Sequence, residues 1–66
     1  MNIKEAQELL GHKYYIECEF MQSTNEYWAH IFSSEKGNVF SMAAFSKSES
    51  GSIKKVLKLF ESKIPG

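Results

Sequence analysis

The sequence has no arginine, no aspartate, one cysteine, one proline and no long apolar run. The lone Cys18 excludes a disulfide scaffold and a zinc site of four cysteines, and a chain without disulfides is typical of the cytoplasm. No apolar segment approaches the roughly 18 residues of a membrane span, and no signal peptide opens the chain. We therefore expect a cytoplasmic protein with no membrane segment.

Eight lysines balance eight glutamates, so the formal net charge is zero, and hydrophobic residues make up 42% of the chain. This composition is typical of a folded protein rather than a disordered one. The length of 66 residues predicts a single domain, residues 1–66. A core of this size supplies only about 3–5 kcal/mol of stability and leaves little room for a walled active site. We therefore expect a partner or a second copy to add buried area.

Apolar residues at helical spacing predict a helix at each end of the chain. Asn2 and Glu5 form a capping-box pattern before the first helix, and Gly11 is suited to end it. Ser52 is expected to cap the second helix, and Pro65 to stop it. The apolar stripe of this second helix consists of Ile53, Val56, Leu57, Phe60 and Ile64.

Three runs between the helices have the composition of strands, at residues 14–21, 27–33 and 38–45. Short polar turns at 22–26 and 34–37 join them, which predicts an antiparallel meander. The fold class is therefore α+β in the order α-β-β-β-α, a three-stranded antiparallel sheet with two helices on one face. The predicted core consists of Ile3, Leu9, Leu10, Ile16, Cys18, Phe20, Ile53, Val56, Leu57 and Phe60.

Two helices on one face leave the other face of the sheet bare. The second and third strands are apolar on both sides, so aromatic groups stay on the bare side whichever side the helices cover. Exposed apolar patches of this kind mark binding surfaces, and aromatic residues dominate their energetics. The alternative is that the helices or a strong sheet twist cover both sides. The predicted contact surface consists of Tyr15, Glu17, Glu19, Trp28, His30, Phe32, Phe40 and Met42.

The sequence offers no constellation of catalytic or metal-binding residues. It has no nucleophile elbow of the form G-x-S-x-G and no glycine-rich phosphate loop. His12 and His30 do not stand at metal-ligand spacing with Cys18, which itself lies on the apolar side of a predicted strand. We therefore expect no enzymatic activity, no cofactor and no metal.

Charge is unevenly distributed along the chain. Residues 1–36 carry three lysines and six glutamates, a sum of −3, and residues 37–66 carry five lysines and two glutamates, a sum of +3. The predicted sheet is therefore acidic and the second helix basic. A basic helix can be an ordinary solvated face or an electrostatic docking surface, which raises association rates more than affinity.

The segment Lys54-Lys55-Val56-Leu57-Lys58 after Gly51-Ser52, together with the order α-β-β-β-α, resembles the double-stranded-RNA-binding domain. In that family a Lys-Lys-x-Ala-Lys run opens the last helix and contacts phosphates across the major groove. The resemblance implies that Lys54, Lys55 and Lys58 bind nucleic acid. The sequence departs from the family at Leu57, which replaces the small alanine, and at residues 22–26, where the family has a Gly-Pro-x-His loop.

Taken together, these patterns favour a non-enzymatic protein-binding module. It would act as a small inhibitor of the kind that phages and other mobile elements carry, by steric occlusion, or as a regulatory adaptor of the cell. The expected partner is a protein, such as a nucleic-acid-handling protein whose basic groove the glutamates would occupy. A homodimer is a further expectation, and nucleic-acid binding through the basic helix is the alternative.

Overall fold

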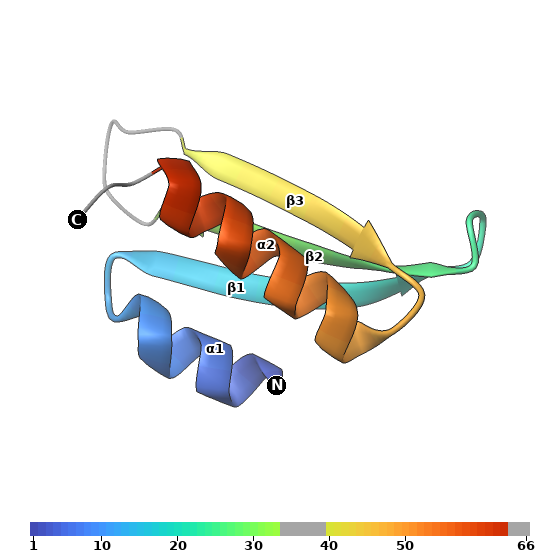
Figure 1. Ribbon diagram of the computed structural model, residues 1–66, viewed down its shortest axis with the longest axis horizontal. Helices are drawn as coiled ribbons and strands as arrows, with labels where there is room; N and C mark the ends of the chain where they lie inside the picture. The colour runs from blue at the N-terminus through green and yellow to red at the C-terminus, as the bar shows by residue number, and fades with distance from the viewer. Residues whose placement is uncertain (34–39, 64–66) are drawn as a thin grey trace.

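The computed structural model describes residues 1–33 and 40–63. It confirms the order α-β-β-β-α, and the three strands form one antiparallel sheet in the order β1-β2-β3 (Figure 1). The predicted turn at 34–37, the first two residues of the third predicted strand and the end of the last helix lie outside the described residues. The elements are α1 (Ile3–Leu10), β1 (Tyr14–Met21), β2 (Glu26–Ser33), β3 (Ser41–Ser46) and α2 (Glu49–Lys63).

The first helix begins and ends as its sequence predicts. The Glu5 amide donates to Asn2 Oδ1 at 2.9 Å, and the Asn2 amide donates to Glu5 Oε1 at 3.3 Å. This reciprocal pair is a capping box, which satisfies two amide groups that a helix start leaves unpaired. Gly11 follows the helix with φ 81°, a conformation that glycine adopts without a steric penalty.

The second helix begins three residues before the predicted cap, so the assignment of Ser52 as its N-cap is wrong. Ser52 lies inside the helix, fully buried, and its hydroxyl donates to Glu49 O at 2.9 Å. Ser48 has the capping role instead, because its Oγ accepts from the Gly51 amide at 3.0 Å. Glycine suits position 51 in this first turn because it has no Cβ. A Cβ there would lie 2.5 Å from Ser46 Oγ, which is too close.

One small cluster forms the core, between the helices and one face of the sheet. Five of the other residues predicted for the core pack partly buried against this cluster. The prediction is wrong for Leu9, which is 69% exposed on the outer side of α1, and for Phe20, which is 46% exposed near the end of β1. The buried apolar residues are Ala6, Ile16, Ala29, Ile31, Ala44, Ile53 and Val56.

The helices divide the covered side unequally. Helix α2 packs along all three strands, and α1 lies beside β1 at the edge of the sheet (Figure 1). Because all the buried strand residues belong to one set of alternating positions, both helices cover the same face. The alternate positions point to the other side of the sheet, where the described residues place no helix.

Candidate partner-binding face

The side of the sheet that neither α1 nor α2 covers is the open face. Strand register decides its membership, because Glu19 pairs with Trp28, and Trp28 pairs with Phe45. Side chains of directly paired residues lie on the same face of a sheet. The open face therefore consists of Tyr15, Glu17, Glu19, Met21, Glu26, Trp28, His30, Phe32, Ser41, Ala43 and Phe45.

A row of stacked rings follows β2 along the middle of the open face. The centroids of Trp28 and His30 lie 4.8 Å apart with an interplanar angle of 19°, and those of His30 and Phe32 lie 5.2 Å apart at 26°. Tyr15 on β1 extends the row, with its centroid 5.7 Å from that of Phe32. Each ring limits the rotamers of the next, so the row is ordered before anything binds. Such preorganisation lowers the entropy lost when a partner docks.

Glutamates line one side of this aromatic row. Glu17 is paired with His30, and Glu19 with Trp28, so two carboxylates lie beside the rings. Glu26 adds a third from β2 itself, opposite Met21. The three strands contain no lysine, since the lysines of the described residues lie on the helices and in the connections. The open face therefore combines aromatic surface with negative charge only.

The structure brings together six of the eight residues predicted for the contact surface. Phe40 and Met42 are the exceptions, because both pack against the core on the covered side. Phe40 makes edge-to-face contacts with Tyr14 and Phe60, with centroids 5.4 and 6.0 Å apart. Their placement with the other six residues is therefore wrong. The six residues on the open face are Tyr15, Glu17, Glu19, Trp28, His30 and Phe32.

Sequence reasoning missed Phe45, which is 43% exposed and lies beside Trp28. Odd-numbered residues of β3 share the open face with even-numbered residues of β2. The register between β2 and β3 therefore places Phe45 on the open face, and the expected Met42 on the covered face. A shift of one residue in register moves every side chain to the other face. The third strand is apolar on both sides, so its sequence has no signal that would have identified this residue.

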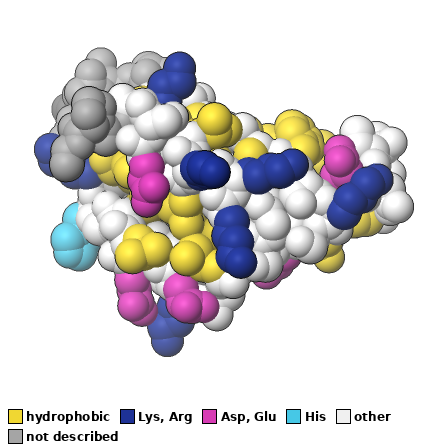
Figure 2. All heavy atoms as spheres, in the orientation of Figure 1, with side chains coloured by type: hydrophobic (Ala, Val, Ile, Leu, Met, Phe, Trp, Pro, Cys, Tyr) yellow, Lys and Arg dark blue, Asp and Glu magenta, His cyan; other side chains and the backbone are white. Residues whose placement is uncertain are grey.

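The lysines of the alternative interpretation lie on the opposite side of the molecule. Lys54, Lys55 and Lys58 are exposed on α2, and Lys55 Nζ donates to Phe45 O at 3.1 Å. Lys55 and Lys58 also line a shallow groove of about 450 Å³ between α2 and β3. On the helix side, lysines are spread among glutamates and apolar side chains and form no continuous basic patch (Figure 2).

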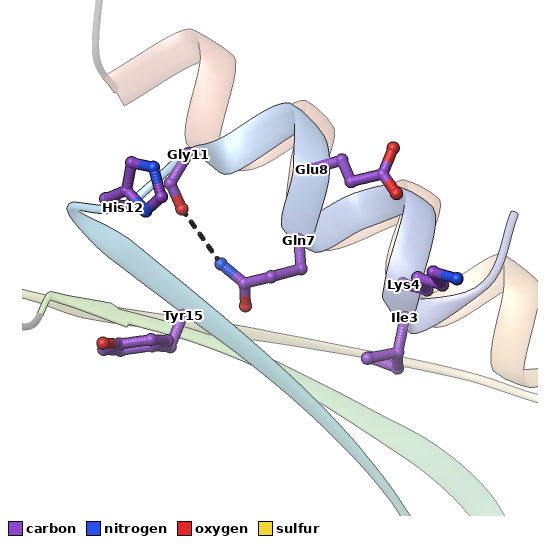
Figure 3. A pocket seen from close by; sticks show the side chains of 7 residues that line it. All are labelled: Ile3, Lys4, Gln7, Glu8, Gly11, His12 and Tyr15. Carbon is purple, nitrogen blue, oxygen red and sulfur yellow. Dashed lines mark hydrogen bonds between the residues drawn. The ribbon is translucent and has the colours of Figure 1, made fainter.

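A second groove, of about 870 Å³, lies between α1 and the start of β1 and is lined by residues that include Ile3, His12 and Tyr15 (Figure 3). Gln7 points from α1 toward the strand. Its Nε2 donates to Tyr14 O at 2.7 Å and to Gly11 O at 3.1 Å. The Ile16 amide in turn donates to Gln7 Oε1 at 3.2 Å. Gln7 therefore joins α1 to the outer edge of β1, a role that no sequence pattern indicated.

The other chemistry-bearing groups are dispersed. In residues 1–33 and 40–63, no three His, Cys or Glu side chains come close enough to hold a metal ion. Cys18 is a free, half-buried thiol whose Sγ lies 3.4 Å from Ser52 Oγ. No helix in the described part of the chain is both long and apolar enough to cross a membrane.

No protein-family model, curated protein or solved structure matches this chain. Its function must therefore be inferred from its own residues.

Proposed function

We propose that this protein is a non-enzymatic protein-binding module whose open face docks on a partner surface with basic side chains around an apolar patch. The observation that carries the proposal is the ordered row Trp28–His30–Phe32 on a sheet face that no described helix covers. Such a module acts as a small inhibitor by occluding its partner's surface, in the manner of phage and mobile-element inhibitors, or as a regulatory adaptor in the cytoplasm.

The aromatic row supplies the affinity in this proposal. Trp and Tyr are enriched among the few interface residues that dominate binding energy, and central, well-packed rings matter most. Trp28 lies on the central strand between Glu19 and Phe45, so its ring has a strand on either side of it on the open face. A partner that covers it would remove more apolar surface from water than one that binds at any edge of the face.

The glutamates supply the choice of partner. Lysine or arginine on the partner can pair with Glu17 and Glu19 and can also stack on the neighbouring rings as cation–π contacts. A nucleic acid would bring phosphates against the same carboxylates, which disfavours it on this face. Two copies docked through their open faces would also bring like charges together, so we favour a different protein over a homodimer.

The test compares immobilised protein with two variants as baits in a lysate of the organism that encodes it. We expect the unmodified protein to retain a specific protein that Trp28→Ala loses. The matched control is Leu59→Ala on α2, which removes an exposed apolar side chain from the helix side and should retain the partner. Equal retention by all three baits, or unfolding of Trp28→Ala in circular dichroism, would refute the open face as the binding surface.

A charge test follows on the retained partner. Reversal of Glu19 to lysine should weaken binding more than reversal of Glu61, which is exposed on α2. Raising the salt concentration should slow association, because exposed charges act mainly on the encounter rate. If both reversals weaken binding equally, the glutamates of the open face do not select the partner.

Nucleic-acid binding through α2 is the alternative proposal, and the exposure of Lys54, Lys55 and Lys58 on one helix supports it. Retention of an RNA duplex on a filter should then fall steeply with salt, and the triple change of these lysines to glutamate should abolish it. Absence of any retained duplex at low salt would refute this alternative and leave the protein-binding proposal unaffected.

A further inference from the structure

The outer edge of β1 is protected along only half of its length. Gln7 presents a donor to Tyr14 O and an acceptor to the Ile16 amide, as a peptide group of a neighbouring strand would. Helix α1 thus supplies a short substitute for a fourth strand. Figure 1 shows that β1 continues well past the N-terminal end of α1.

The second half of this edge has backbone groups with no partner among residues 1–33 and 40–63. In antiparallel strands the N–H and C=O of one residue point to the same side, and the side alternates along the strand. The N–H and C=O groups of Ile16 point away from β2, so those of Cys18 and Phe20 do as well. The described residues make no hydrogen bond to the outward main-chain groups of these two residues.

Several of the usual devices that blunt a sheet edge are missing here, although Glu17 and Glu19 give β1 charge on its open face. Edge strands are commonly protected by charged side chains, especially lysine, by proline, by bulges or by short length. Strand β1 has eight residues without lysine or proline, and it pairs with β2 without a bulge. The opposite edge differs, because β3 has six residues and Lys55 donates to Phe45 O.

We propose that the backbone of Cys18 and Phe20 takes up an extended segment of the partner as a fourth strand of the sheet. This inference rests on the proposed function and states how the partner is held. Lysine or arginine side chains of the added strand would lie beside Glu17 and Glu19, on the open face. The alternate side chains would be apolar and lie beside Cys18 and Phe20, on the covered side.

Charge decides between such a segment and a second copy of this chain. If two β1 edges paired with Cys18 opposite Phe20, Glu19 would lie directly opposite the same residue of the other copy. If Cys18 lay opposite itself, Glu17 would face Glu19. Like charges directly opposite each other destabilise a sheet, whereas opposite charges stabilise it. The edge therefore favours a basic strand over self-pairing.

The test uses the full chain labelled with ¹⁵N and a short blocked peptide of alternating lysine and valine. In the free protein, the amides of Cys18 and Phe20 should exchange rapidly with solvent. The peptide should slow their exchange several-fold and shift their resonances, and a matched peptide of alternating glutamate and valine should do neither. The inference is overturned if the lysine peptide leaves both amides unprotected, or if protection rises with protein concentration alone, which would show self-pairing.

A pair of variants makes the test specific to the backbone. Phe20→Pro removes an outward amide and leaves the hydrogen bonds to β2 in place, whereas Phe20→Val keeps the amide. We expect Phe20→Pro to bind the lysine peptide about tenfold more weakly than Phe20→Val. Equal binding by the two folded variants would overturn the inference, and the exchange measurement on the unmodified chain decides it if Phe20→Pro does not fold.

The open face is tested separately from the edge. Trp28→Ala should keep the response to the lysine peptide even though it loses the natural partner. If the unmodified protein retains the partner but does not respond to the lysine peptide, the proposed strand addition at the edge is refuted and the open face is not. Retention of the partner by Trp28→Ala, with the amides of Cys18 and Phe20 still protected by the peptide, would refute the open face alone.

Discussion

The two faces of the sheet differ in side-chain size rather than in polarity alone. On the covered face, β2 and β3 present the small residues Ala29 and Ala44, which are almost fully buried. On the open face, β2 presents the rings of Trp28, His30 and Phe32. Small residues let α2 lie close to the sheet, and close packing is what a short chain needs for stability. Where Ala29 and Ala44 face α2 the covered side has no space for a ring, and its rings, Tyr14, Phe40 and Phe60, gather together against another part of the core.

The largest effect should come from the covered side of β2. Ile31→Ala removes a side chain with no exposed surface and should cost about 2–5 kcal/mol, which is comparable with the whole stability of a domain of this size. We expect the variant to lose its cooperative thermal transition in circular dichroism. Its neighbour Phe32→Ala, on the open face, should keep that transition. If Phe32→Ala is the more damaging change, the assignment of the two faces is wrong.

A smaller loss is expected where α1 meets β1. Gln7→Ala removes three hydrogen bonds and leaves the Tyr14 carbonyl and the Ile16 amide without a partner in a part-buried position. We expect the free energy of unfolding in urea to fall by about 1–3 kcal/mol. Glu8→Ala, one position along the same helix and exposed, is the control and should change it by no more than about 0.5 kcal/mol. Equal effects of the two changes would show that Gln7 does not secure the edge.

Trp28→Ala should have a modest effect on stability despite the size of the ring. The change removes the stacking contact with His30 and the cross-strand contacts with Glu19 and Phe45. The free energy of unfolding should fall by about 1 kcal/mol or less. The urea midpoint should move little, and partner binding should be lost. A loss of stability as large as that of Ile31→Ala would identify Trp28 as a core residue.

The smallest effect is expected on α2. Lys58→Ala changes an exposed side chain and should alter the free energy of unfolding by less than about 0.5 kcal/mol. Retention of the protein partner should not change, because this lysine lies on the side away from the open face. Loss of the partner in this variant would instead locate binding on the helix side.

The sequence predicts the order of elements because helix and strand periods differ clearly along it. The capping box of Asn2 and Glu5 and the end of the helix at Gly11 are local signals, and both are confirmed. Ser52 was assigned wrongly because Ser48 and Ser52 both can cap a helix, and tertiary packing places Ser52 in the core.

The candidate site was predicted for strands β1 and β2 and not for β3. Strand β1 alternates between apolar and acidic residues, so its two faces can be distinguished in the sequence. Strand β3 has apolar residues at alternate positions on both faces, and only its register with β2 decides that Phe45 is outside and Met42 inside. Leu9 and Leu10 are adjacent in α1, and a helical pattern alone does not choose between them.

The hydrogen bonds between Gln7 and the backbone of β1 also have a consequence for variants with a shortened N-terminus. A variant that lacks residues 1–10 would present the whole length of β1 as a bare strand edge. A longer bare edge is a longer template for pairing with other chains, so the shortened protein should be more prone to aggregation than the full chain. An eight-residue helix thus decides how much of the sheet edge is open to pairing with another chain.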